Sequence, residues 1–286
     1  MGSLIEPPFP RIAIVGLGLI GGSIALAIKR RWPSAVIAAI DRQPVVDAAL
    51  EMRIVDEGAV SLDAVAGATL VMLAAPVLQN VAAMKALPAH LEAAIVTDAG
   101  STKRAMEEAA ADLPDGLVYI GGHPLAGAAV SGVEAARPDL FDDRPWILTP
   151  SPRSSAGALE ALSQFVSGLR AVPHVMDAET HDRLLAYISH LPQLAVSALM
   201  HVVGTHAGPE GLALAGRGLR DTTRLASSPA PAWRDIVATN GDNIASAIDD
   251  LIAALQQLKA GAREGAPELE RMFVSAARWK GVLEHS

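Results

Sequence analysis

The feature that most constrains this chain is a short glycine-rich segment near its beginning. A β-branched apolar run over residues 12–15 stops at the sequence GLGLIG over residues 16–21, and apolar residues then recur at helical spacing. A strand, a glycine turn and a helix in this order are typical of the phosphate-binding start of a dinucleotide-binding fold. Gly16 permits the tight turn, Gly18 lets the backbone approach a pyrophosphate, and Gly21 lets the helix pack on the strand.

Two other interpretations of this segment are a purely structural turn and a signal or membrane segment. Four glycines interrupt the apolar run, which falls short of the ~20 residues that a membrane span needs. The next apolar run, residues 35–40, ends at Asp41, placed to accept the ribose hydroxyls of an adenosine. Asp41 repels the 2′-phosphate of NADP, although Arg42 could tolerate one, so we predict NAD and leave NADP open. The residues predicted to bind the cofactor are Gly16, Gly18, Leu19, Ile20, Gly21, Asp41, Arg42, Ala75, Pro76 and Ser101.

Composition limits the classes of protein to which the chain can belong. Of its 286 residues 51% are hydrophobic, which predicts a folded protein with a large core. The formal charge of −8 argues against a nucleic-acid surface, which needs clustered Lys and Arg. The absence of cysteine excludes disulfides and thiolate sites, and no His/Asp cluster has metal-binding spacing. We find no signal peptide or membrane span and expect a cytoplasmic protein without a metal.

Strands and helices alternate over the first part of the chain. Continuous apolar runs such as residues 68–75 fit strands buried on both faces of a parallel sheet. We predict a doubly wound α/β domain of the Rossmann type over residues 1–176. Residues 177–286 show only Ala/Leu-rich helical periodicity, with helices expected at 209–226 among other places. This second domain is predicted to be all-helical and to form a homodimer interface.

Polar residues follow three of the predicted strands, where ligands bind in such sheets. His123 lies in a predicted glycine-flanked loop, residues 121–127, and is either a proton acceptor or a cap of a backbone carbonyl. Ser101 could bind a substrate hydroxyl or cap the helix that follows. Lys103 is a candidate general acid, a phosphate contact or a solvated lysine in the first turn of that helix.

The helical half contains two arginines with a candidate binding role. Arg220 and Arg224 are four residues apart and would share one helix face. One of them could hold a substrate carboxylate in a bidentate pair, or could pair with an aspartate across a helix contact. The sequence His181-Asp182 is interpreted as a salt-bridged first turn, and His190 as a residue that orients a helix junction.

A series of motifs resembles the prephenate/arogenate dehydrogenase family of tyrosine biosynthesis. They occur in the family's order over nearly the whole chain: VGLGLIGGS at 15–23, DAGSTK at 98–103, GHPLAG at 122–127, LF at 140–141, ILTP at 147–150, HDRL at 181–184, ISHLP at 188–192, LRDTTRLA at 219–226 and WRDI at 233–236. The resemblance implies an NAD-dependent oxidative decarboxylation of prephenate to 4-hydroxyphenylpyruvate, of arogenate to tyrosine, or of both.

The resemblance also implies roles for individual residues. His123 matches the acceptor of the substrate hydroxyl proton, and Ser101 matches a residue that hydrogen-bonds the hydroxyl and the histidine. Arg224 matches the arginine that grips a substrate carboxylate, and Trp233 matches a residue that reaches the active site of the other subunit. The substrate-binding residues expected on this basis are Arg224, Gln193, His190, Arg220, Trp233 and Ala128.

Two departures from the family pattern concern the choice of substrate. Prephenate-specific relatives often carry Thr-Glu where this chain has Ala128-Ala129, and a histidine where it has Gln193. Both positions are expected near the pyruvyl or alanyl side chain that distinguishes prephenate from arogenate. Strict prephenate specificity is therefore not predicted. The rival functions are another dehydrogenase with a Rossmann and a helical domain, of the 3-hydroxyacid or pyrroline-carboxylate type, and a non-catalytic dinucleotide sensor.

Overall fold

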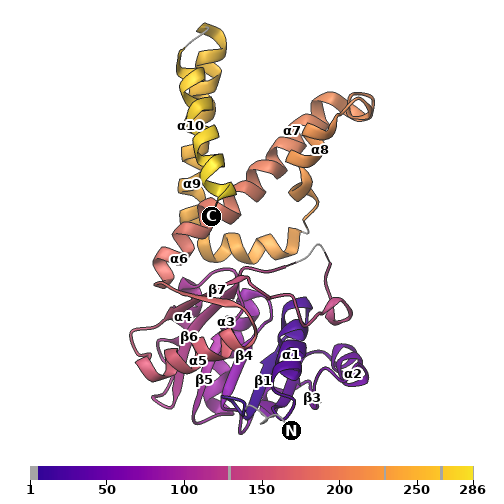
Figure 1. Ribbon diagram of the computed structural model, residues 1–286, viewed down its shortest axis with the longest axis vertical. Coiled ribbons are helices and arrows are strands. Elements are labelled where there is room, and N and C mark those ends of the chain that lie inside the picture. Colours follow the sequence, from indigo (N-terminus) through magenta and orange to yellow (C-terminus); the bar gives the residue numbers. More distant parts are fainter. Residues whose placement is uncertain (1–5, 128–129, 229, 265–266, 286) are drawn as a thin grey trace. The chain divides into compact units, whose positions relative to one another are not determined.

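The apolar runs of the first part of the chain form one eight-stranded sheet in the computed structural model, which describes residues 6–127, 130–228, 230–264 and 267–285. The strand order is β3-β2-β1-β4-β5-β6-β7-β8, and all neighbours are parallel except β6 and β7. The strands are β1 (Arg11–Val15), β2 (Val36–Ile40), β3 (Glu57–Ala59), β4 (Leu70–Leu73), β5 (Ala94–Asp98), β6 (Leu117–Pro124), β7 (Pro145–Pro150) and β8 (Val172–Val175). This sheet, with helices between its strands, confirms the predicted Rossmann-type fold (Figure 1).

Helices cover both faces of the sheet because strand side chains alternate between two cores. Ile12 and Ile14 pack into one core with residues of α1 and α5, whereas Ala13 packs into the other with residues of α3 and α4. The helices of this region are α1 (Leu19–Arg31), α2 (Gln43–Glu51), α3 (Val77–Ala86), α4 (Arg104–Ala110), α5 (Ala156–Gly168) and α6 (Ala178–Leu185). Burial on both faces explains why these strands show no polar alternation.

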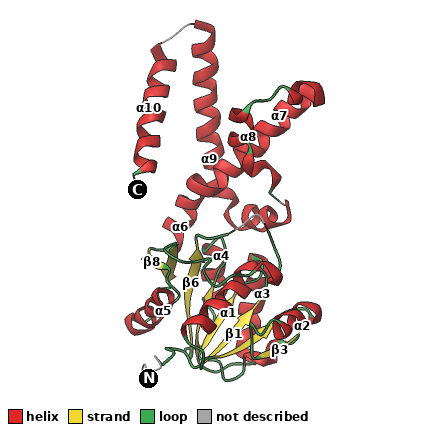
Figure 2. Cartoon of the chain, turned by 45° about the vertical axis from the view of Figure 1, so that its right-hand side comes forward, coloured by secondary structure: helices red, strands yellow, loops and turns green. Residues whose placement is uncertain are grey.

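The remainder of the described chain is helical, as predicted (Figure 2). Its helices are α7 (Leu191–Ala213), α8 (Arg217–Thr222), α9 (Ala230–Glu264) and α10 (Pro267–Glu284). Helix α7 is interrupted at Gly208, where φ is +59°, and α9 is interrupted at Asn240. The last part of α9 and α10 run side by side in both views (Figures 1 and 2).

The chain divides into two compact units whose limits differ from the predicted boundary at residue 176. One unit is Met1–Leu185 with Ser228–Asn240, and the other is Ala186–Ser227 with Gly241–Ser286. Helix α6 belongs to the first unit because it packs on α4 and β7. The first part of α9 belongs there because Asn240 donates a hydrogen bond to the Asp182 carbonyl at 2.8 Å and accepts one from Arg104 at 3.0 Å.

Candidate active site

The carboxyl ends of four parallel strands lie in register at one edge of the sheet. Val15 at the end of β1 pairs with Ile40 of β2 and Leu73 of β4, and Leu73 pairs with Asp98 of β5. β1 and β4 lie side by side in the sheet. From this pair the strand order continues in opposite directions, to β2 next to β1 and to β5 next to β4. Ligands of doubly wound sheets bind outside the strand ends at such a reversal.

The glycine turn lies at this reversal, and two of its glycines are required by the backbone. Gly16 has φ +96°, and a Cβ there would lie 2.5 Å from the Ala75 nitrogen. A Cβ at Gly21 would lie 1.9 Å from the Gly16 carbonyl oxygen. A Cβ at Gly18, by contrast, would meet no heavy atom within 4 Å. Gly16 and Gly21 thus serve close packing, whereas the space beside Gly18 is open to a ligand.

A cavity of about 570 Å³ opens at the glycine turn, which we call the glycine-turn cavity. It is lined by Val15, Gly16, Gly18, Ile40, Asp41, Arg42, Ala74, Ala75, Pro76 and Gln79. The half-buried Asp41 carboxylate accepts hydrogen bonds from the Leu17 and Arg42 backbone N–H groups, both at 2.7 Å. A carboxylate has lone pairs for further donors, so Asp41 can still accept ribose hydroxyls. The open space at Gly18 and the acceptor at Asp41 fit the adenosine diphosphate half of NAD.

The remaining residues predicted to contact the cofactor lie at the same edge of the sheet but do not line the glycine-turn cavity. Leu19 and Ile20 are half-buried in the first turn of α1, and Ser101 is half-buried in the loop after β5. Sequence reasoning missed Asn80, a buried residue of α3. Its side chain accepts a hydrogen bond from the Ala75 nitrogen at 3.0 Å and donates one to the Leu73 carbonyl at 3.1 Å, which holds the loop after β4 in place.

His123 lies on a strand, so the prediction of a loop over residues 121–127 is wrong for its first part. β6 continues to Pro124 because β7 pairs with it in the antiparallel direction, and His123 is the partner of Ile147. The His123 Nδ1 atom is 2.8 Å from Nε2 of His181, in the first turns of α6. The Nδ1 atom of His181 is in turn 2.8 Å from Oδ1 of Asp182. The two histidines and this aspartate, which we call the His-His-Asp chain, are therefore linked by consecutive hydrogen bonds.

His181 and Asp182 are in contact at the start of α6, where a salt-bridged first turn was predicted, and both side chains are fully buried. Burial lowers the pKa of His181 below its ordinary value and outweighs the opposing hydrogen bond to Asp182. Burial raises the pKa of Asp182, but hydrogen bonds from His181 and from the Arg104 and Lys103 backbone N–H groups outweigh it and hold the pKa below its ordinary value. A neutral imidazole next to a carboxylate follows from these directions.

Lys103 is fully buried and ion-paired with Asp98, so the interpretation as a solvated lysine is wrong. Its Nζ also donates to the Gly122 carbonyl at 2.6 Å. Asp98 accepts further hydrogen bonds from the Tyr119 hydroxyl at 2.9 Å and from the Gly100 nitrogen at 2.8 Å. Burial lowers the pKa of Lys103, and the charge of Asp98 opposes that shift. Through the hydrogen bond from Lys103 to the Gly122 carbonyl, this cluster holds the backbone of β6 in place next to His123.

The other residues that were predicted to bind the substrate are divided between the two units. His190 and Gln193 are buried in the second unit, and the Gln193 amide donates to the Leu225 carbonyl at 2.8 Å. Trp233 is half-buried in α9, in the part that belongs to the first unit. Ala128 lies outside the described residues.

Arg220 and Arg224 do not share one continuous helix, contrary to the prediction of a helix over 209–226. Helix α8 ends at Thr222, and Arg224 begins a separate 3₁₀ turn, Arg224–Ser227. Over the described part of the chain neither guanidinium has an ion-pair partner, so the predicted aspartate pairing is not observed.

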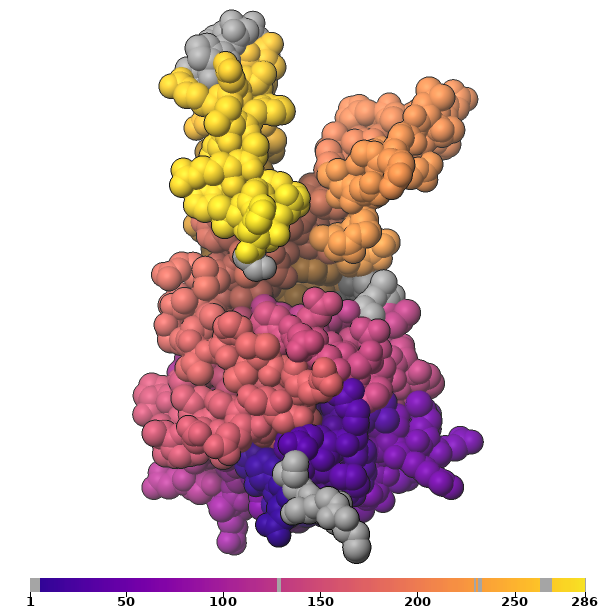
Figure 3. Space-filling model, viewed as in Figure 1, coloured from indigo at the N-terminus to yellow at the C-terminus, as the bar shows by residue number. Residues whose placement is uncertain are grey.

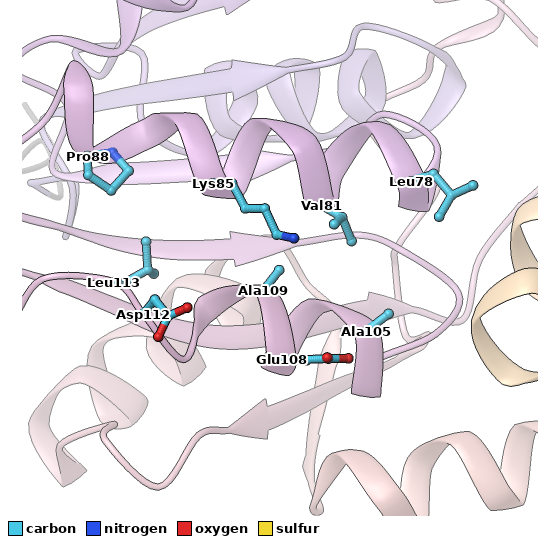
Figure 4. Close-up of a pocket in the computed structure, with 9 residues that line it drawn as sticks. All are labelled: Leu78, Val81, Lys85, Pro88, Ala105, Glu108, Ala109, Asp112 and Leu113. Carbon is cyan, nitrogen blue, oxygen red and sulfur yellow. The ribbon is translucent and has the colours of Figure 1, made fainter.

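A second cavity of about 550 Å³ lies between α3 and α4 (Figure 4). Lys85 extends over it from α3, Glu108 lies on α4, and Asp112 lies in the turn that follows α4 (Figure 4). None of the predicted site residues lines it. Within the described ranges, we find no group of three or more His, Asp or Glu side chains that could hold a metal, and no helix that is long and apolar enough to cross a membrane.

Comparison with known proteins gives a consistent result over both parts of the chain. Residues 24–175 match the family described as prephenate dehydrogenase, nucleotide-binding domain, and residues 177–274 match prephenate dehydrogenase, dimerization domain. The chain is 37% identical over 285 residues to a prephenate dehydrogenase of Bacillus subtilis, covering 95% of this chain and 76% of that protein.

Two solved structures align with nearly the whole chain. Prephenate dehydrogenase from Aquifex aeolicus, in complex with hydroxyphenyl propionate and NAD+, is 30% identical with a TM-score of 0.87, covering 99% of this chain and 100% of that one. Synechocystis arogenate dehydrogenase is 30% identical with a TM-score of 0.83, covering 96% and 99%. Relatives with both substrate names thus share the fold of this chain.

Proposed function

Because this chain belongs to the prephenate dehydrogenase family, we propose that it oxidises and decarboxylates prephenate, arogenate or both, with His123 as the proton acceptor. The observation that carries the assignment of His123 is its position at the sheet edge that also holds the glycine-turn cavity, with Nδ1 engaged by a buried neighbour. Such a histidine can take up a proton near neutral pH.

The residues have distinct tasks in this reaction. NAD, when bound, supplies the acceptor for the hydride that leaves the carbinol carbon of the substrate. His123 takes the hydroxyl proton, so that the O–H bond breaks, an N–H bond forms and a carbonyl develops at that carbon. The electron pair of the bond to the ring carboxylate then enters the ring, carbon dioxide leaves, and the ring becomes aromatic. Proton return from His123 to the resulting phenolate oxygen balances the reaction.

Replacement of His123 tests this assignment. The variant His123→Asn should bind NAD+ with unchanged affinity and lose about 100-fold or more in kcat, the range that a general base contributes. The matched control is His174→Asn, because His174 is an exposed histidine on β8 of the same sheet. Near-normal turnover of His123→Asn, or an equal loss in both variants, would reject His123 as the base.

Arg224 is our candidate for binding a substrate carboxylate. An exposed arginine without an ion-pair partner in the described chain supports this, since a guanidinium binds a carboxylate through two parallel hydrogen bonds. Ser101 is our candidate for binding the substrate hydroxyl, with support from its half-buried position in the loop after β5.

The preference between substrates is best measured in one two-by-two comparison of prephenate with arogenate and NAD with NADP. The carboxylate of Asp41 in the glycine-turn cavity supports a preference for NAD, since it would repel a 2′-phosphate and the Arg42 side chain is 86% exposed with its Nε 3.8 Å from Asp41 Oδ1. A higher kcat/KM with NADP than with NAD would reject this role of Asp41. Absence of turnover with both substrates would reject the proposed function itself.

A homodimer formed through the helical part of the chain is supported by the matched dimerization domain and by exposed apolar side chains. Phe273, Trp279 and Leu283 on α10 are 67%, 61% and 69% exposed. Helix α10, at the C-terminal end of the colour scale, is visible over its length on the surface in Figure 3. Several large apolar side chains exposed on one helix favour a protein–protein interface. A monomer mass by light scattering at micromolar concentration would refute the dimer.

A further inference from the structure

The structure links the proposed base to a second, fully buried histidine, and from this link we infer that His181 is a positioning residue. We propose that His181, held by Asp182, fixes the proton of neutral His123 on Nδ1 and thereby makes Nε2 the atom that accepts the substrate proton. The inference rests on the proposed function for its catalytic consequence, but the tautomer itself can be measured without turnover.

The first step of the argument is the direction of the hydrogen bond between His181 and Asp182. The Asp182 carboxylate accepts from the Lys103 nitrogen at 2.7 Å and from the Arg104 nitrogen at 3.0 Å. An ionised carboxylate has no proton to donate. The contact of 2.8 Å between its Oδ1 and His181 Nδ1 therefore requires the proton on His181 Nδ1.

The second step transfers this constraint to His123. A neutral imidazole carries one proton, so the Nε2 atom of His181 is an acceptor once Nδ1 is the donor. That acceptor is 2.8 Å from His123 Nδ1, and the two rings meet at 60° with centroids 5.1 Å apart. His123 must then donate from Nδ1, which leaves Nε2 as the basic atom of its neutral ring. Burial, which lowers the pKa of His181, supports the neutral state on which this step depends.

The third step is the rigidity of the chain of contacts. His181 and Asp182 are both 0% exposed, and Asp182 is held through its backbone as well, because its carbonyl accepts from the Asn240 side chain at 2.8 Å. His123 is held by its pairing with Ile147 across the two antiparallel strands. Since β6, α4, α6 and α9 all contribute, neither histidine ring can turn without breaking a hydrogen bond of the His-His-Asp chain.

The charged groups near His181 favour the same hydrogen bond from His123 Nδ1 to His181 Nε2 after His123 has taken up the substrate proton. The groups near it are His123, the Asp182 carboxylate and, farther away, the buried Lys103–Asp98 pair. When His123 becomes an imidazolium, its Nδ1–H still donates to His181, and the Asp182 carboxylate lies beyond that ring. A buried carboxylate stabilises a cation that forms near it, as in a Ser-His-Asp triad.

The tautomer can be read directly from nitrogen chemical shifts. In the full-length protein labelled with ¹⁵N-histidine, the signals absent from His123→Asn identify His123. We expect a protonated Nδ1 and an unprotonated Nε2 for neutral His123 in the wild type. A protonated Nε2 would overturn the inference regardless of how any variant folds.

Two substitutions of His181 separate a positioning role from a merely structural one. His181→Leu removes the acceptor, whereas His181→Gln retains an amide oxygen that can accept from His123 Nδ1. We expect His181→Leu to lose about 10- to 100-fold in kcat with unchanged NAD+ affinity, and His181→Gln to recover most of this loss and keep the Nδ1–H tautomer. Equal kcat in the two variants would overturn the inference. If the wild type shows the expected tautomer but turns over neither prephenate nor arogenate, the proposed function fails and the tautomer assignment stands.

Discussion

Substituting Gly18 separates ligand binding from folding at the glycine turn. Gly18 has φ −73° and ψ −163°, a conformation open to any residue, and a Cβ there meets no heavy atom within 4 Å. Gly18→Ala should therefore fold normally. Because alanine leaves the unfolded chain fewer conformations than glycine does, the substitution should stabilise the protein by about 0.4–1 kcal/mol. The added methyl group occupies the space beside the first turn of α1 that the glycine-turn cavity offers to a pyrophosphate.

The expected loss is in cofactor affinity. A hydrogen bond to a charged phosphate contributes about 1.5–3 kcal/mol, and 1.4 kcal/mol corresponds to a factor of ten in Kd. Loss of one such bond should raise the Kd of NAD+ about 10- to 100-fold. Calorimetric titration measures this Kd, and the unfolding of the same samples by heat measures stability.

Gly21→Ala is the matched comparison, since the same methyl group is added one turn further along α1. Its Cβ would lie 1.9 Å from the Gly16 carbonyl oxygen, which cannot move without distorting the turn. Overpacking of this kind costs about 1–3 kcal/mol or more, so the Tm of Gly21→Ala should fall. A Kd of Gly18→Ala within twofold of wild type would refute the pyrophosphate position, and an unchanged Tm of Gly21→Ala would refute the packing argument.

Three further predictions concern stability and substrate binding. Lys103→Met leaves a buried carboxylate without its cation and should lower the free energy of unfolding by about 3–5 kcal/mol in urea titrations, against less than about 0.5 kcal/mol for Lys280→Met in an exposed i,i+4 pair; similar losses would contradict the burial argument. Arg224→Ala should raise the substrate KM about tenfold or more, with a smaller effect for Arg220→Ala, and an unchanged KM would remove Arg224 from this role. Below pH 6.5 His181 becomes protonated in the unfolded chain but stays neutral in the folded protein, where its pKa is lowered. The free energy of unfolding should therefore fall by up to about 1.4 kcal/mol per pH unit until the pH reaches the pKa of folded His181. His181→Gln should lose less stability than wild type between pH 7 and pH 5.5, and an equal loss would show that the pKa of His181 is not lowered.

The glycine turn and the first strands could be predicted because their pattern is local. The apolar residues of 12–15 and 35–40 form β1 and β2, and their uninterrupted hydrophobicity indicates a sheet covered on both faces. Asp41 follows β2 directly, so its place at the strand end required only the strand boundary. The helical second half was predictable for the same reason, since helix periodicity is a property of neighbouring residues.

The errors occur where a distant partner decides the local structure. β6 reaches His123 because β7 offers antiparallel hydrogen bonds beyond the parallel part of the sheet. From the sequence Lys103 resembles a surface residue in the first turn of a helix. In the structure its ammonium group is buried, where it pairs with Asp98 and donates a hydrogen bond to the Gly122 carbonyl. The break between Arg220 and Arg224 has no proline or glycine to predict it.

Periodicity, glycine spacing and motif order were enough to predict the fold class, the glycine turn after β1 and the family. These properties depend on residues close together in the chain, whose geometry follows from backbone sterics and hydrophobic burial. The His-His-Asp chain could not be obtained in this way, because His123 and His181 are 58 residues apart and meet only when α6 packs on α4 and β7. Which nitrogen of His123 carries the proton depends on that contact, because Nε2 of the buried His181 is an acceptor when its Nδ1 donates to Asp182.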